Sequence, residues 1–241
     1  MEITYLLNSG FLIREGRTLL VFDDFEDPLH AVDEAVAKGG FDAFYIFVSH
    51  AHFDHFGMSI LDYADTVTKY IFSDDVRHTG RGHVFPQDKV TYMKTYSDWA
   101  DGKLCVKSFD STDAGTCFLV DTGSARIFHA GDFNWWHWTG ETEENRLLAR
   151  NAFRKQMRKL EGMEADVAFF PIDGRMGDAW DMGAKEFCAR TRVKSLVTMH
   201  NIGYPMWRPR EGFFAEGKDI PYWTPEKPGE HRVFSEGGFT E

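Results

Sequence analysis

Ser49-His50-Ala51-His52-Phe53-Asp54-His55-Phe56-Gly57 organises this chain, because it places three histidines and a carboxylate within a few residues of one another. Residues 44–48, directly before it, are apolar, aromatic and β-branched, which predicts a buried strand. Alternate residues of an extended segment point to the same side, so the imidazoles of His50 and His52 can bind one ion. If the chain then turns, Asp54 and His55 are directed at a second position nearby.

A single histidine beside a strand is usually structural, but four potential ligands crowded together are costly unless an ion compensates them. We therefore expect this stretch to bind metal. Neutral imidazole suits zinc, iron or nickel, and a carboxylate extends the range to manganese. The ligand types alone do not distinguish zinc from manganese or iron.

The stretch resembles the signature of the metallo-β-lactamase fold hydrolases, and two later segments extend the resemblance in the same order. Ile127-Phe128-His129-Ala130-Gly131-Asp132 is similar to the family's strand ending in Gly-Asp, whose carboxylate bridges two metals. Val197-Thr198-Met199-His200 is similar to the late strand that ends in the final histidine ligand. The resemblance covers most of the chain.

The resemblance implies a ligand set for two divalent metal ions, with zinc as the first expectation and manganese or iron as alternatives. His50 and His52 are expected to hold metal one, and Asp132 to bridge. Asp54, His55 and His200 are expected to hold metal two. In this family an aspartate at an early strand end supports the metal loop, which makes Asp23 or Asp24 a candidate; the other possibility is a pair of surface turn aspartates.

The chain departs from the family pattern at one ligand. The family supplies a third histidine for metal one from a loop that corresponds to residues 110–115, and this loop contains no histidine. Asp113 is the first candidate to replace it, Asp110 and His129 the others, although His129 is expected to face elsewhere. A weakly held metal one, or a single metal, is also open.

Two divalent metals can share a hydroxide at neutral pH and polarise a carbonyl or phosphoryl oxygen. We expect a hydrolase that cleaves an ester, lactone, amide or phosphodiester of a small molecule, with Asp54 orienting the water. His137 is a candidate proton donor. Trp135 and Trp136 form either an aromatic wall near the metals or an anchor of the loop in the core, and Arg175 binds either an anionic substrate group or a structural carboxylate.

Two other classes of function stay open. A flavodiiron-like redox enzyme typically has a glutamate where His52 stands, and no flavin domain is evident. A non-catalytic binding protein with an altered metal site is the second alternative.

The composition restricts partners and location. The net charge of −11, from 27 basic and 38 acidic residues, argues against a long nucleic acid as substrate. Three scattered cysteines without a Cys-x-x-Cys pair favour a reducing cytoplasm. No apolar run is long enough for a transmembrane helix, and no signal peptide is recognisable, so we expect no membrane association. A homo-oligomer remains possible.

Repeated runs of strands followed by helices fit an α/β (α+β) protein with a four-layer αββα sandwich. We expect one domain over residues 1–241, with an aromatic and proline-rich tail, residues 202–241, that packs on the domain or on a partner subunit. The expected helices are residues 28–38, 59–66, 144–163 and 184–192. The expected strands include a hairpin of residues 11–14 and 18–22, then residues 70–72, 105–109, 117–120, 126–130, 166–173 and 195–200, with a polar loop over residues 73–88.

Overall fold

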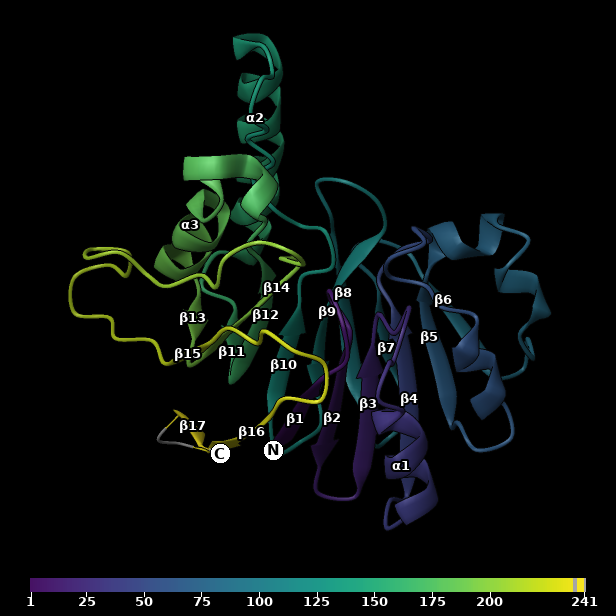
Figure 1. The fold of residues 1–241 in the computed structure, drawn as a ribbon. Coiled ribbons are helices and arrows are strands. Elements are labelled where there is room, and N and C mark those ends of the chain that lie inside the picture. The colour runs from purple at the N-terminus through teal and green to yellow at the C-terminus, as the bar shows by residue number, and fades with distance from the viewer. Residues whose placement is uncertain (236–237, 241) are drawn as a thin grey trace.

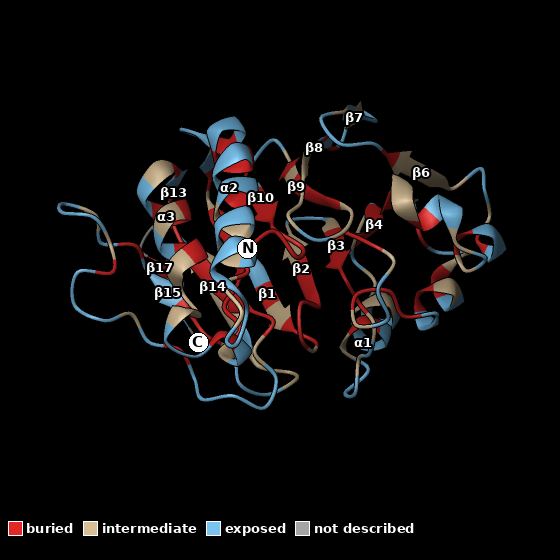
Figure 2. Cartoon of the chain, turned by 90° about the horizontal axis from the view of Figure 1, so that it is seen from above, coloured by how far each residue is buried: buried red, intermediate tan, exposed pale blue. Residues whose placement is uncertain are grey.

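The computed structural model describes residues 1–235 and 238–240. Two large β-sheets face each other, α1 lies on one side of the molecule, and α2 and α3 lie on the other (Figures 1 and 2). This arrangement confirms the predicted αββα sandwich. Glu236, Gly237 and Glu241 of the predicted tail lie outside the described residues. Within the described ranges, no helix is both long and apolar enough to cross a membrane.

The first sheet contains eight strands in the order β17-β16-β1-β2-β3-β4-β5-β6. The predicted hairpin forms its centre, with β2 antiparallel to β3. From β3 to β6 all neighbours are parallel, so their carboxyl ends meet at one edge. The bounds are β1 Glu2–Tyr5, β2 Phe11–Glu15, β3 Thr18–Phe22, β4 Ala43–Val48, β5 Lys69–Ser73, β6 Val90–Met93, β16 His231–Ser235 and β17 Gly238–Thr240.

The second sheet contains seven strands in the order β15-β14-β12-β10-β9-β8-β7, and a short parallel pair, β11 and β13, lies apart from it. Strands β10, β12, β14 and β15 are parallel, so this sheet also has an edge where carboxyl ends meet. The bounds are β7 Asp98–Ala100, β8 Cys105–Asp110, β9 Thr116–Asp121, β10 Arg126–His129, β11 Glu164–Ala165, β12 Val167–Pro171, β13 Arg192–Val193, β14 Leu196–Met199 and β15 Tyr222–Trp223.

The helices follow the apolar pattern of the sequence. Helix α2, Glu143–Leu160, buries Phe153, Met157 and Leu160, as their spacing predicts, and Thr142 Oγ1 accepts a hydrogen bond from the main-chain N–H of Asn145. Helix α3 spans Met182–Arg190. Helix α1, Ala31–Lys38, begins three residues later than predicted, because His30 has a left-handed backbone with φ 55°.

Short 3-10 turns occur where the sequence predicts a helix and within a predicted loop. The helix expected at residues 59–66 is a 3-10 turn over Ser59–Tyr63. The expected loop over residues 73–88 contains two such turns, Asp74–His78 and Gly82–Val84. A further turn spans Gly174–Ala179.

Strand β4 belongs to two cores at once, and all of its residues are buried. Phe44, Ile46 and Val48 pack with Val32 of α1, whereas Tyr45 and Phe47 point between the sheets. Figure 2 shows this buried interior between exposed helical surfaces. The continuous apolar run therefore holds the segment that precedes the histidines from both sides.

The C-terminal tail contributes to both sheets. Trp207 is fully buried and packs against Phe213, with ring centroids 4.9 Å apart. Strand β16 pairs antiparallel with β1, and β15 extends the second sheet beside β14. These strand pairings were not predicted from the sequence.

Candidate metal centre

Residues from five strand ends meet at one place. Asp23 follows β3, and the loop of residues 49–57 follows β4; Asp132, Asp173 and His200 follow β10, β12 and β14. Each of these segments leaves the carboxyl end of a parallel strand. The parallel topology of the two sheets thus brings together residues that are far apart in the sequence.

The ligand atoms form two groups that share Asp132. His50 Nε2 lies 3.0 Å from His52 Nδ1 and 3.5 Å from Asp132 Oδ2. In the second group, His55 Nε2 lies 3.1 Å from Asp132 Oδ1 and 3.9 Å from Asp54 Oδ2. His200 Nε2 lies 3.7 Å from Asp54 Oδ2 and 3.5 Å from Asp132 Oδ1. All six residues expected as ligands are therefore within reach of one another.

Hydrogen bonds on the far side of the rings fix their orientation. Asp23 Oδ2 accepts from His55 Nδ1 at 2.7 Å and from Ser49 Oγ at 2.6 Å, and Ser49 Oγ lies 2.9 Å from His50 Nδ1. Asp173 Oδ2 accepts from His200 Nδ1 at 3.0 Å. These contacts leave the Nε2 atoms of His50, His55 and His200 facing the shared centre.

The charges of the centre are strongly coupled. Burial and the nearby His55 lower the pKa of His50 to about 4. Burial opposes the charge on His55, but Asp132 and Asp23 outweigh it and raise its pKa to about 10. Burial also acts against Asp132, yet the histidines around it hold the pKa of this carboxyl well below its usual range. The centre therefore combines a neutral imidazole with a buried carboxylate.

Two buried atoms at the centre make no hydrogen bond among the described residues: His55 Nε2 and Asp132 Oδ1. They lie 3.1 Å from each other, and a bound cation would give each of these buried atoms a ligand bond. Imidazole nitrogens and carboxylate oxygens are also the donors that zinc, iron and manganese accept. The residues therefore fit divalent metal ions.

Three non-glycine residues at the centre have left-handed backbones: Asn8 with φ 56°, Asp23 with φ 43° and His200 with φ 63°. Such conformations cost free energy and occur preferentially at functional sites. Two of them are connected, because the main-chain N–H of His200 donates to Asn8 O at 3.1 Å. The side chain of Asn8 also donates from Nδ2 to Asp54 Oδ2 at 3.3 Å.

Gly115 lets the loop of residues 110–115 approach the metal loop. Its φ is +67°, and a Cβ atom there would lie 2.0 Å from Ser49 O and 2.5 Å from His50 Cβ. The next residue, Thr116, donates its N–H to Ser49 O at 2.9 Å. Only glycine fits this position without displacing the backbone.

The three candidates for the missing histidine lie in different environments. Asp113 Oδ2 is 4.0 Å from His52 Nδ1, and Asp113 groups with His52 and Asp132 as potential ligands. Asp110 Oδ2 instead accepts from Gln156 Nε2 at 2.7 Å. His129 is fully buried; its Nε2 donates to Ser9 O, and its Nδ1 accepts from the N–H of Gly131.

The two tryptophans predicted near the substrate, Trp135 and Trp136, lie in different environments. Trp135 stacks on Phe153 of α2, with ring centroids 5.9 Å apart, which corresponds to the loop-anchoring alternative. Trp136 stacks on Trp138 and lies edge-on to His200, with ring centroids 5.9 Å apart.

His137 and Arg175 lie outside the ligand groups. The His137 Nδ1 atom is buried without a hydrogen-bond partner among the described residues. Arg175 pairs with Asp173 through its Nε and Nη2 atoms, and its guanidinium lies over the Trp138 ring.

Sequence reasoning did not identify Ser49, Asn8 or the role of Asp173. Asp173 lies at the end of a predicted strand, as the histidines do, so its position in the sequence could have identified it as a candidate residue of the site. Asn8 lies in a polar turn before β2, which is a weaker signal, because such turns are common.

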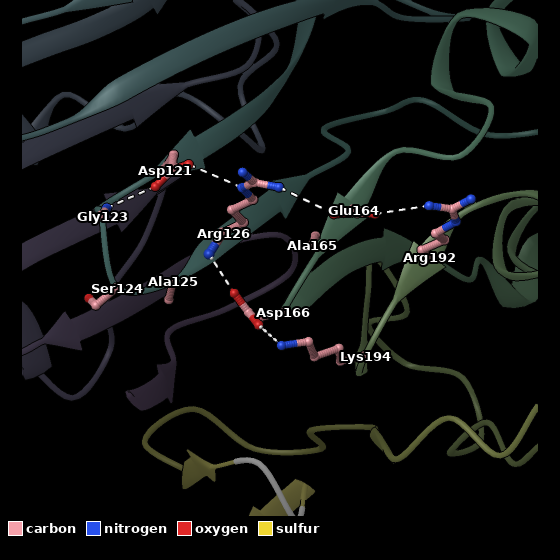
Figure 3. A pocket seen from close by; sticks show the side chains of 10 residues that line it. All are labelled: Asp121, Gly123, Ser124, Ala125, Arg126, Glu164, Ala165, Asp166, Arg192 and Lys194. Atoms are coloured by element: carbon pink, nitrogen blue, oxygen red, sulfur yellow. Dashed lines mark hydrogen bonds and ion pairs between the residues drawn. The ribbon is translucent and has the colours of Figure 1, made fainter.

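A cavity of about 620 Å³ lies away from these metal-ligand candidates (Figure 3). It is lined by the start of β10 and by β11 and β13, and its charges pair with one another. Arg126 contacts Asp121 and Glu164, Arg192 contacts Glu164, and Lys194 contacts Asp166 at 2.7 Å. This arrangement is that of a surface ion-pair network.

No protein-family model matches the chain. Its sequence is 25% identical over 233 residues to a protein of Thermus thermophilus described as a UPF0173 metal-dependent hydrolase, covering 90% of each chain. A protein of the same description from Heliobacterium modesticaldum is 26% identical over 226 residues, covering 86% of this chain and 84% of the relative.

Solved structures show the same fold at lower sequence identity. Igni18, described as a novel metallo hydrolase from the archaeon Ignicoccus hospitalis, superposes with a TM-score of 0.63 at 17% identity, covering 95% of this chain and 96% of Igni18. The metallo-β-lactamase fold protein YhfI from Bacillus subtilis gives 0.59 at 12% identity, covering 95% and 98%.

The sandwich, with its histidines and aspartates at the carboxyl ends of parallel strands, is the metallo-β-lactamase fold, which the chain shares with these solved structures. Its sequence is similar to the UPF0173 proteins along most of its length.

Proposed function

We propose that the protein is a metal-dependent hydrolase with a binuclear centre, which cleaves an ester, lactone, amide or phosphodiester bond of a small molecule. The observation that carries the proposal is a set of three overlapping ligand groups around the buried Asp132: His50 with His55 and Asp132, His52 with Asp113 and Asp132, and Asp54 with His55 and His200. The descriptions of the UPF0173 relatives as metal-dependent hydrolases support it.

We assign one ion to each side of Asp132. His50, His52, Asp113 and Asp132 would hold the first ion, and Asp54, His55, His200 and Asp132 would hold the second, as their mutual distances allow. We expect zinc, with manganese or iron as alternatives, because all donors are nitrogen and oxygen atoms. When bound, two such ions supply a nucleophile from water at neutral pH and polarise the oxygen of the bond to be cleaved.

The protein's own residues would hold this centre and direct the reaction. Asp23 and Asp173 orient His55 and His200, and Asn8 orients Asp54. Asp54 is partly exposed, which suits our prediction that it positions the attacking water. His137 remains our prediction for the proton donor to the leaving group. A cytoplasmic location and self-association also remain predictions.

The first test is the metal content per chain, measured by elemental analysis after reconstitution of the wild type, Asp113→Ala and Asp110→Ala. We expect two metals in the wild type, about one in Asp113→Ala, and two in the control Asp110→Ala, because Asp110 is bound to Gln156. One metal in all three proteins would contradict the binuclear assignment.

The second test is hydrolysis by the metal-loaded wild type of nitrophenyl esters, a lactone, an amide and bis(p-nitrophenyl) phosphate. Turnover that disappears with a chelator and returns with metal is the expected result. A protein that holds two metals and cleaves none of these bonds would count against the hydrolase and favour a binding protein.

A further inference from the structure

A cavity of about 280 Å³ adjoins the second ligand group. Asp54 and His200 line it on the side of the metal centre. Its other walls include Phe25, Phe53, Ile202 and Tyr204. An apolar cavity that contains a few polar groups from a reactive centre is typical of a substrate site.

The apolar side chains of this cavity are unusually exposed. Phe53 is 79% exposed, Ile202 51% and Tyr204 45%. Single exposed apolar residues are common on protein surfaces, but a group of them around one cavity indicates that a ligand covers them. Phe53 lies between His52 and Asp54, so the apolar surface begins at the metal ligands themselves.

The cavity wall is held in place by specific contacts. Tyr204 packs directly on Gly174, where a Cβ atom would lie 2.3 Å from Tyr204 Cγ. Asn201 Oδ1 accepts from the N–H of Gly174 at 3.0 Å, and Asn201 Nδ2 donates to Pro205 O at 2.9 Å. The segment that carries Ile202 and Tyr204 is thus bound to the segment that follows β12.

The side chains around the cavity provide no free cation for an anionic group. Arg175 lines it, but its guanidinium is paired with Asp173, which also accepts from His200. Asp54 and Asp173 are two carboxylates among the lining residues. Asp54 is assigned to the second metal ion, and Asp173 already neutralises Arg175, so the lining residues offer no free cationic side chain to an anionic group of the substrate.

We propose that this cavity binds the acyl group of an uncharged substrate, and that the enzyme hydrolyses esters or lactones of short aliphatic acids rather than phosphodiesters. The proposal rests on the proposed hydrolase function. The volume of about 280 Å³ corresponds to about nine water-sized groups of about 30 Å³ each, which is room for the two ester oxygens and an acyl chain of up to about six carbons. Water adds to the acyl carbon, the bond to the alcohol oxygen breaks, and one proton of the water passes to that oxygen.

The test is kcat/KM of the metal-loaded full chain for p-nitrophenyl acetate, butyrate, hexanoate and decanoate, with bis(p-nitrophenyl) phosphate for comparison. We expect a rise of about threefold or more for each CH₂ up to hexanoate, since each buried CH₂ contributes on this scale. We expect no further rise to decanoate, and the phosphodiester should be the poorest substrate.

Two variants and one control locate the effect. Phe53→Ser and Ile202→Ser should flatten the dependence on chain length, with unchanged metal content. Leu29→Ser should retain it, because Leu29 is also exposed, at 56%, but lines a different cavity. Calorimetric binding of the uncharged hexanamide and acetamide provides a second readout, in which hexanamide should bind the wild type more tightly.

Different failures have different meanings. Equal kcat/KM for all esters would overturn the inference and leave the hydrolase intact. Cleavage of the amide or the phosphodiester but of no ester or lactone would also overturn the inference and leave the hydrolase intact. If a protein with two metals cleaves none of these bonds, the proposed function fails, and hexanamide binding no tighter than acetamide would then overturn the inference as well. A dimer that Phe53→Ser and Ile202→Ser convert to a monomer in sedimentation would show that a second copy covers the apolar surface, which also overturns it.

Discussion

At the scale of single residues, two adjacent aspartates have different roles that their order in the sequence does not reveal. Asp23 accepts hydrogen bonds from Ser49 and His55. Its neighbour Asp24 is also buried, but its Oδ1 atom has no hydrogen-bond partner among the described residues. The turn after β3, with Asp23 in a left-handed conformation, sends the two side chains in different directions.

Asp23→Asn should weaken metal binding, because an amide has one acceptor oxygen, whereas the carboxylate accepts from the Ser49 N–H at Oδ1 and from Ser49 Oγ and His55 Nδ1 at Oδ2. Loss of such an orienting group typically costs about 10–100-fold in metal affinity. The measurement is competition for zinc with a chelator. Asp24→Asn is the matched control and should bind zinc like the wild type; equal losses in both variants would refute the distinction between the two residues.

Asp24 should make stability depend on pH. Burial, with Asp27 and Asp33 nearby, raises its pKa to about 7 in the folded protein, whereas an aspartate in the unfolded chain has a pKa of about 3.9. The protonated Asp24 carboxyl therefore makes its full contribution to the free energy of unfolding below about pH 4, and this contribution is lost as the pH rises to about 7.

Asp24→Asn removes this dependence. Relative to the wild type, its free energy of unfolding should increase between about pH 4 and 7, by up to about 4 kcal/mol, and then stay level. Urea unfolding of the metal-free wild type and variant at several pH values measures this difference in the free energy of unfolding. A constant difference across this range would mean that Asp24 ionises normally in the fold.

At the scale of elements, the approach of two loops builds the centre. The loop before β9 contacts the loop after β4 through Gly115 and Thr116, and it also carries Asp113. The sequence indicates a polar turn at residues 110–115, but it does not indicate that this turn packs against Ser49. That contact requires the two sheets to be stacked face to face.

Gly115→Ala should therefore be worse than an ordinary substitution at a left-handed glycine. Gly123→Ala is the control, because Gly123 has φ +83° and no atom within 4 Å of an added Cβ. Both variants carry the conformational cost of about 1–2 kcal/mol, but only Gly115→Ala displaces Ser49 and His50. We expect it to unfold more easily than Gly123→Ala by at least about 1 kcal/mol and to bind zinc about tenfold more weakly; equal behaviour would argue against the close approach.

At the scale of the whole molecule, the two ends of the chain complete the same sheet. Strand β1 pairs with β16, and β16 with β17 (Figure 1). Between β14 and β15 the tail inserts Trp207 into the core, where its Nε1 donates to Asp181 Oδ2 at 3.0 Å. The tail is thus part of the folded structure around the centre.

Trp207→Ala should lower the free energy of unfolding by about 3–5 kcal/mol, the usual cost of removing a large buried aromatic side chain. Met206→Ala, at the neighbouring and partly exposed position, should cost less than about 1 kcal/mol. Chemical denaturation followed by circular dichroism compares the two. Similar small losses would indicate that the tail does not stabilise the fold.

The sequence by itself indicated the class of fold and the six central ligand candidates, because the apolar strand with its histidines is a local feature and three such segments in order carry the resemblance to a known family. It also indicated most helices and strands, since their apolar periodicity is local. Only the tertiary structure distinguished Asp23 from Asp24 and separated Asp113 from Asp110 and His129. Only the tertiary structure showed that Ser49, Asn8 and Asp173 make hydrogen bonds with the residues of the centre. Those distinctions depend on which segments meet when two sheets stack and parallel strands end at one edge, and such contacts between distant segments leave no local pattern in the sequence.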